Sequence, residues 1–83
     1  MKNVRISKHT EPSKAASSIL YFLEAGDNVE VSALGSSAGT LIKAVGLVSN
    51  LSSLDLSYHP RIEYIKDDRG ATRSAVMMTI LLK

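Results

Sequence analysis

The feature that most constrains the fold is an apolar segment in the middle of the chain, from Ala38 to Ser49. Leucine, isoleucine and valine occur on nearly all of its sides at helical spacing, and Lys43 is its only charged residue. A helix that packs on one side keeps a polar face, so this pattern predicts a helix that is buried on two sides. The second side would be covered by another copy of the chain. The alternative is that the helix is simply the centre of a small core.

A homodimer is the simplest source of that second contact. The chain has 83 residues, and a domain of this size buries only about 60–65% of the surface that its unfolded chain exposes. Association would therefore add to a marginal core. The candidate dimer interface is formed by the large apolar residues of the helix, which are Leu41, Ile42, Val45, Leu47 and Val48.

The residues on either side set the limits of this helix. Apolar and polar residues alternate in Val29–Leu34, which predicts a half-buried strand. Gly35 then permits a tight turn, and the hydroxyl of Ser36 or Ser37 can cap the first N–H groups of the helix. Asn50 is expected to end the helix in a left-handed conformation.

The first third of the chain predicts another strand and another helix. Val4 and Ile6 alternate with polar residues, as in a half-buried strand. Thr10 can cap a helix that has Pro12 in its first turn, where no N–H is needed. Gly26 is expected to end this helix.

The last third predicts two strands joined by a turn. Residues 54–66 favour an extended conformation, in which Pro60 marks an edge, a bulge or a break because proline cannot donate to a ladder. Asp67–Gly70 is a turn sequence. The strand Thr72–Leu82 ends in residues that are apolar on both faces, which indicates an interior strand or one covered in a dimer.

Together these elements follow the order βαβαββ. Crossovers between parallel strands are right-handed in nearly all proteins, so both helices are expected on one face of a four-stranded mixed sheet. We therefore predict a two-layer α+β fold that forms a single domain over residues 1–83.

Composition and motifs argue against several classes of function. The chain has no cysteine, which excludes disulfides, thiolate metal sites and a cysteine nucleophile. It has no signal sequence and no apolar run that could span a membrane, so we expect an intracellular protein of the cytoplasm, nucleoid or nucleus. His9 and His59 are isolated, and the segment Gly35–Gly39 lacks the Gly-Lys-Ser/Thr ending of a phosphate loop. We expect no catalytic activity, metal, cofactor or small-molecule substrate.

The distribution of basic residues is more informative than the net charge of +2. Lys8 follows a strand and precedes a helix, a junction that suits a phosphate group. Arg69 and Arg73 flank a hairpin, which can lie along a nucleic-acid groove. Arg5 should face away from the helices, and Lys43 can extend from its helix to a phosphate. The alternative is that these are solvated surface charges. For Arg69 and Arg73 that alternative includes ion pairs to Asp67 and Asp68 of the hairpin.

Three segments resemble the Alba family of small dimeric chromatin and RNA-binding proteins, including its bacterial relatives of the stage V sporulation protein S type. Val4–Lys8 is similar to the first strand of that family. Glu30–Gly35, followed by Leu41–Val45, is similar to its second strand, glycine turn and second helix. Asp68–Ser74 is similar to its basic hairpin. The resemblance extends over nearly the whole chain.

This resemblance implies a dimeric protein that binds DNA or RNA with little sequence preference. The contacts would be to phosphates, made by the basic strand end and by the hairpin arms. The alternative is a regulatory module of the same fold that binds or assembles other proteins, with weak or no nucleic-acid binding. The low net charge is compatible with that alternative.

Overall fold

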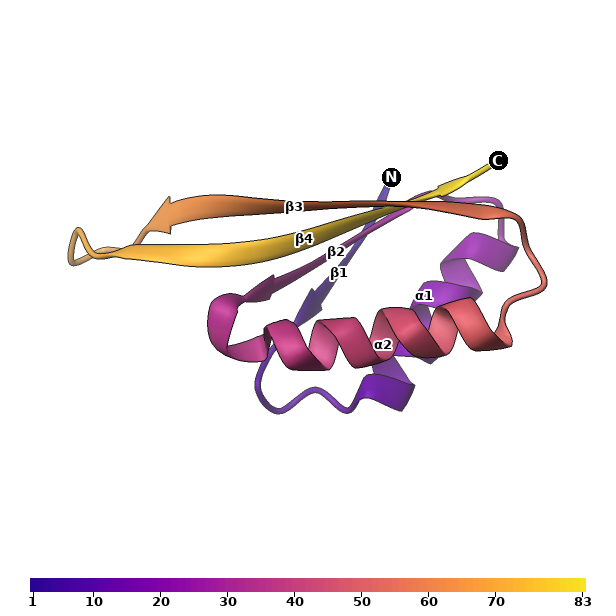
Figure 1. Ribbon diagram of the computed structural model, residues 1–83, viewed down its shortest axis with the longest axis horizontal. Helices are drawn as coiled ribbons and strands as arrows, with labels where there is room; N and C mark the ends of the chain where they lie inside the picture. Colours follow the sequence, from indigo (N-terminus) through magenta and orange to yellow (C-terminus); the bar gives the residue numbers. More distant parts are fainter.

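Both helices lie on one face of a four-stranded mixed sheet, which confirms the predicted fold class (Figure 1). The computed structural model covers residues 1–83. The elements in chain order are β1 (Lys2–Ile6), α1 (Pro12–Glu24), β2 (Val29–Leu34), a short 3₁₀ helix η1 (Gly35–Ser37), α2 (Ala38–Leu51), β3 (Leu56–Lys66) and β4 (Thr72–Leu82). Neither helix is long and apolar enough to cross a membrane.

The strands are arranged in the order β1-β2-β4-β3. β1 is parallel to β2, and β4 is antiparallel to both of its neighbours. The apolar end of β4 is therefore in the interior of the sheet, one of the two positions that its sequence indicates. β3 is an edge strand and runs through Pro60 without a break, since the edge position tolerates the missing N–H donor.

The core lies between the sheet and the helices. Val29, Val31 and Ala33 of β2 face the helical layer, beside Ile80 of β4. The helices contribute several side chains that are fully buried, among them Ile19, Leu23, Leu41 and Val48. Burial of each such side chain stabilises the fold by roughly 1.5–3 kcal/mol. The opposite face of the sheet carries no helix, and we call it the open face.

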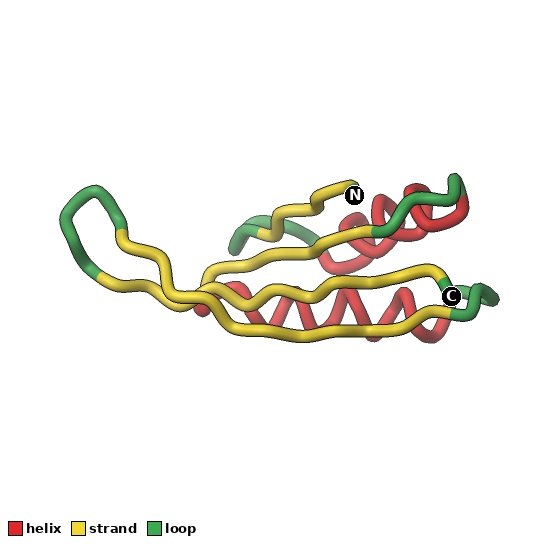
Figure 2. The backbone as a smooth tube through the Cα atoms, turned by 90° about the horizontal axis from the view of Figure 1, so that it is seen from above, coloured by secondary structure: helices red, strands yellow, loops and turns green.

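The paired ends of β3 and β4 extend beyond the rest of the sheet. Both strands have 11 residues, whereas β2 has six. The pairing of β4 with β2 ends at Ala75. Residues 64–74 therefore form a two-stranded hairpin that projects past the helical layer, here called the arm (Figures 1 and 2). Its turn is closed by Asp67, whose N–H donates to the carbonyl of Ala71 at 2.9 Å, and Gly70 adopts a φ of +80°.

The predicted helix ends require correction. Thr10 does not cap α1, because its hydroxyl accepts instead from the N–H of Ser7 at 2.9 Å. Ser37 precedes α2 without a capping hydrogen bond from its side chain, since η1 leads directly into the helix. Helix α2 continues through Asn50, and its end at Ser52 is extended rather than left-handed. Gly26 does follow α1 with a φ of +92°, as expected for a glycine stop.

Candidate nucleic-acid interface

Three of the predicted nucleic-acid-binding residues meet in one cleft on the open face. Arg5, Lys8 and Arg73 line this cleft, which has a volume of about 590 Å³. It lies where the ends of β1 and β2 and the helix η1 approach the base of the arm. The three cations come from distant parts of the sequence, and the parallel pairing of β1 with β2 and the antiparallel pairing with β4 bring them together.

The cleft exists because small side chains lie between larger ones. Ser32 pairs with Arg5 on one side and with Met77 on the other. In the next row of the open face, Ala75 lies between Leu34 and the glutamate of β3. The side chain of Ser32 is too short to fill the space between its neighbours, and the half-buried Ser32 leaves a hollow in the floor of the cleft. Ala75 lies at the bottom and is only 3% exposed.

Two of the cleft cations have no acidic partner. None of the ion pairs in the structure involves Arg5 or Lys8, and both residues are exposed. Arg73 does pair with Asp67, at 3.4 Å between Nε and Oδ2. The predicted ion pairing within the hairpin thus applies to Arg73, whereas Arg5 and Lys8 retain their positive charge for a ligand.

Asp67 is chiefly a turn residue. Its carboxylate accepts hydrogen bonds from the N–H groups of Ala71 and Arg69, each at 2.9 Å. These bonds, of which the one from Ala71 has the largest effect, hold the pKa of Asp67 below its usual value, and the charge of Arg73 lowers it further. The aspartate therefore stays ionised and orders the tip of the arm.

The other two predicted residues lie outside the cleft. Arg69 is exposed in the turn at the tip of the arm, and Lys43 is exposed on α2. The structure thus divides the five predicted cations into a group of three in the cleft, one at the arm tip and one in the helical layer.

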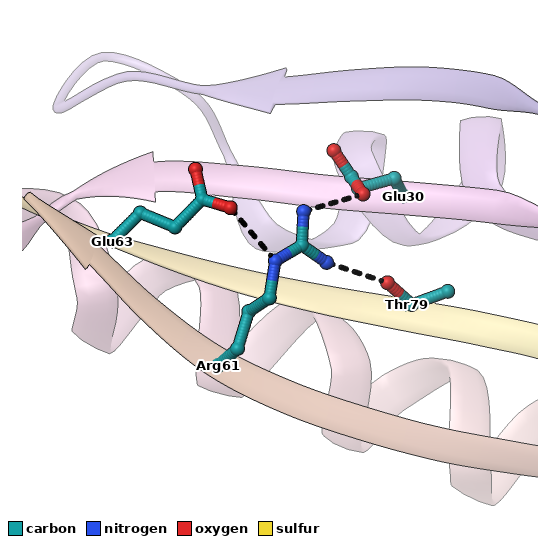
Figure 3. A network of polar contacts seen from close by, with 4 residues as sticks. All are labelled: Glu30, Arg61, Glu63 and Thr79. Carbon is teal, nitrogen blue, oxygen red and sulfur yellow. Dashed lines mark hydrogen bonds and ion pairs between the residues drawn. The ribbon is translucent and has the colours of Figure 1, made fainter. Parts of the chain in front are cut away.

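The middle of the open face is occupied by a polar network that sequence reasoning missed (Figure 3). Arg61 of β3 donates from Nη2 to Glu30 and from Nε to Glu63, both at 2.9 Å, and from Nη1 to Thr79 at 3.1 Å. The hydrogen bonds to Glu63 and then Glu30 raise the pKa of Arg61. One cation and two carboxylates give this region a formal charge of −1, so the positive charge of the open face is concentrated at the cleft. Arg61 lies beside Glu30 because of the register of β2, β4 and β3. The sequence does not reveal this register, so the contact could not be predicted from it.

Gly35 allows η1 to approach the base of the arm. A Cβ atom at this position would lie 2.8 Å from the hydroxyl oxygen of Ser74. The glycine predicted to form a tight turn is therefore also needed for close packing between η1 and β4. This packing positions Ser36, at the rim of the cleft.

Among solved structures, the chain is similar to Alba from Thermoplasma volcanium. The match has a TM-score of 0.74 and includes 95% of this chain and 98% of that chain, at 11% sequence identity. This chain has the Alba fold. No family model matches the sequence, and no curated protein does. The similarity lies in the arrangement of strands and helices, so the properties of the surface must be argued from the residues of this chain.

In this Alba fold, the predicted dimer interface on α2 is only partly exposed. Leu41 and Val48 point into the core of the single chain and are fully buried, which corrects their assignment to a dimer surface. Val45 and Leu47 are half-buried, and Ile42 is 65% exposed. The helix keeps one side on its own sheet, as its 3.6-residue period requires, and Ile42 lies outside that side.

Two further exposed apolar residues lie on the helix-facing side of β3. Ile62 is 63% exposed and Tyr64 is 76% exposed. The register places both on the same side of the sheet as the core residues. Tyr64 belongs to the arm, and Ile62 lies just before it, where it pairs with Val76. Their alternation with polar residues in β3 was visible in the sequence, but the length by which the arm exceeds the helical layer was not.

Proposed function

We propose that this chain forms a small homodimer that binds DNA or RNA through phosphate contacts, with little sequence preference. The observation that carries the proposal is the convergence of Arg5, Lys8 and Arg73 on one cleft, with Arg5 and Lys8 lacking any acidic partner. Arg and Lys side chains bind phosphates, and such contacts position a protein without reading bases. Arg69 adds a fourth cation at the tip of the arm.

The exposed apolar residues support the dimer. Ile42, Ile62 and Tyr64 are each more than 60% exposed, and the start of α2 lies beneath the base of the arm (Figures 1 and 2). A second copy that covers these side chains would remove them from water. It would approach from the helical side of the sheet, so the cleft on the open face would remain accessible.

The test is a salt series measured by fluorescence anisotropy with labelled DNA and RNA. The affinity should fall as salt rises, with a slope of log K against log salt near −0.9 for each phosphate that is neutralised on duplex DNA. Lys8→Glu should weaken binding about tenfold or more at low salt. Lys14→Glu, which makes the same charge change at an exposed position on α1, is the control and should have little effect.

A second function has one observation in its favour. The charge of Arg61 is balanced by two glutamates, so most of the open face is not basic. A module that binds other proteins would suit such a surface. If a variant that combines Lys8→Glu, Arg69→Ala and Arg73→Ala binds DNA and RNA as the natural chain does, this second function replaces the first. Under both proposals the chain has a binding role and no catalytic one.

A further inference from the structure

We propose that the cleft on the open face holds one unpaired nucleotide, so that the chain prefers single-stranded nucleic acid to a duplex. This inference rests on the proposed function and adds to it the form of nucleic acid that is recognised. A surface that binds only phosphates needs cations but no cavity. Here the cations surround a cavity of about 590 Å³, within the range of roughly 300–1,000 Å³ that small-molecule sites occupy.

The floor of the cleft suits the flat, largely apolar face of a base. Leu34 and Met77 contribute apolar atoms around the nearly buried Ala75, and Ser32 adds a hydroxyl that can pair with an edge of the base. The guanidinium of Arg73, 63% exposed on the wall of the cleft, can stack on a base, as arginine does in RNA-binding proteins.

The phosphate group has a separate place in the same cleft. Arg5 and Lys8 lie on the β1 side, across the floor from Arg73. A nucleotide with its base on the floor would direct its phosphate to these two unpaired cations. Glu63, on the β3 side, is held by Arg61 at 2.9 Å, so the acidic group of the wall is already paired and the cationic side remains favourable for an anion.

The geometry also distinguishes an unpaired base from a paired one. Bases of a duplex are stacked and covered on both faces, so they cannot reach a recessed apolar floor unless the duplex opens. Single strands expose their bases, and stacking on protein side chains then adds to the phosphate contacts.

The first experiment compares a labelled single-stranded oligonucleotide with a blunt duplex of the same sequence, at matched salt, in ribose and deoxyribose forms. The natural chain should bind the single strand more tightly than the duplex. Ser32→Leu fills the floor without a change of charge and should weaken single-strand binding about tenfold. Ser57→Leu makes the same change on the open face at the far end of β3 and should leave single-strand binding unaltered.

The second experiment uses only the natural chain, so its result does not depend on whether a variant folds. Nuclear magnetic resonance spectra of the natural chain are recorded with adenosine 5′-monophosphate and, separately, with inorganic phosphate. The nucleotide should shift the amide signals of Ser32, Leu34 and Ala75, whereas phosphate alone should affect chiefly those of Arg5 and Lys8.

Two results would overturn the proposal. One is equal affinity for single strand and duplex with unchanged binding by folded Ser32→Leu. The other is a set of amide shifts that is the same for the nucleotide and for phosphate. Either result would leave the salt-dependent phosphate binding of the proposed function intact. Loss of all salt-dependent binding in the natural chain would instead remove both proposals.

Discussion

Single residues decide where the open face is positive. Arg61 contributes a cation, but its hydrogen bonds to Glu30 and Glu63 leave the centre of the sheet with a formal charge of −1. Arg5 and Lys8, only a few residues from the start of the chain, have no such partners. The two regions differ in whether their cations have acidic partners, so the net charge of the chain does not show where its positive charge is exposed.

Glu63→Gln should strengthen nucleic-acid binding, because the change removes a carboxylate from the wall of the cleft and releases part of the charge of Arg61. We expect an affinity about two- to threefold higher at low salt. The difference should shrink above about 0.1 M salt, where the Debye length falls below about 10 Å. Anisotropy titrations at two salt concentrations measure it. Glu24→Gln, at the exposed end of α1, is the matched control, and an equal gain for both variants would contradict the expectation.

The turn of the arm should be sensitive to acid. Folding lowers the pKa of Asp67, so its contribution to stability is complete above the unfolded value of about 3.9 and is lost as the pH falls through the lower folded value. Asp67→Asn should flatten the dependence of stability on pH below about pH 4. Urea unfolding between pH 2 and 6 compares the two chains, and identical slopes would show that the aspartate is not linked to folding.

At the scale of elements, α2 shows what a sequence pattern can and cannot predict. The apolar residues around α2 correctly predicted a helix that packs against the sheet. The sequence alone could not distinguish the buried residues Leu41 and Val48 from the exposed Ile42. That division depends on how the helix is rotated about its axis, which the opposing surface of β2 and β4 determines. The network of Arg61 escaped prediction for a similar reason, because it depends on strand register.

Neighbouring positions on α2 should therefore behave in opposite ways. Leu41→Ala creates a cavity in the core and should lower the free energy of unfolding by about 2–5 kcal/mol, without a preference for the monomer. Ile42→Asp should retain the fold and yield a monomer, because it places a charge in the proposed dimer surface. Urea unfolding and light scattering distinguish the two, and a dimeric Ile42→Asp would contradict the assignment of that surface.

The contact between η1 and β4 offers a second test at this scale. In Gly35→Ala the new methyl group would lie 2.8 Å from the hydroxyl oxygen of Ser74, so the serine must rotate or the turn must move. We expect a loss of about 1 kcal/mol. The loss should be recovered in the double variant Gly35→Ala with Ser74→Ala, which removes the clashing oxygen. A double-mutant cycle measures the coupling, and additive effects would show that the close contact has no energetic consequence.

The whole molecule is a two-layer fold whose sheet is covered by helices on one face and open on the other (Figure 1). The order of elements and the strand Thr72–Leu82 could be predicted, because periodicity and turn residues are local signals. The resemblance implied hairpin arms, but the length of the arm could not be predicted, since it reflects the difference in length between β2 and the longer strands β3 and β4. Tyr64 was therefore missed as an exposed residue, although its place in a strand was foreseen.

A dimer should double the number of phosphate contacts for each bound particle. If each copy contributes the cations of one cleft and one arm, the natural chain should show a slope of log K against log salt about twice that of a monomeric Ile42→Asp variant. The comparison requires titrations of both chains over the same salt range. Equal slopes would mean that one copy alone contacts the nucleic acid.

Side chains alternate between the two faces along the arm, so the geometry of the turn determines which residues face the cleft and which face the apolar side. Tyr64 and Arg73 belong to adjacent pairs of the ladder and point to opposite faces. If β4 slipped by a single residue relative to β3, the serine after Arg73 would take its place above the cleft, and the guanidinium would point toward the apolar side. The clamp that Asp67 forms across the turn, together with the left-handed Gly70, fixes the alignment. An insertion of one residue between them would therefore disturb both faces at once, although it touches neither.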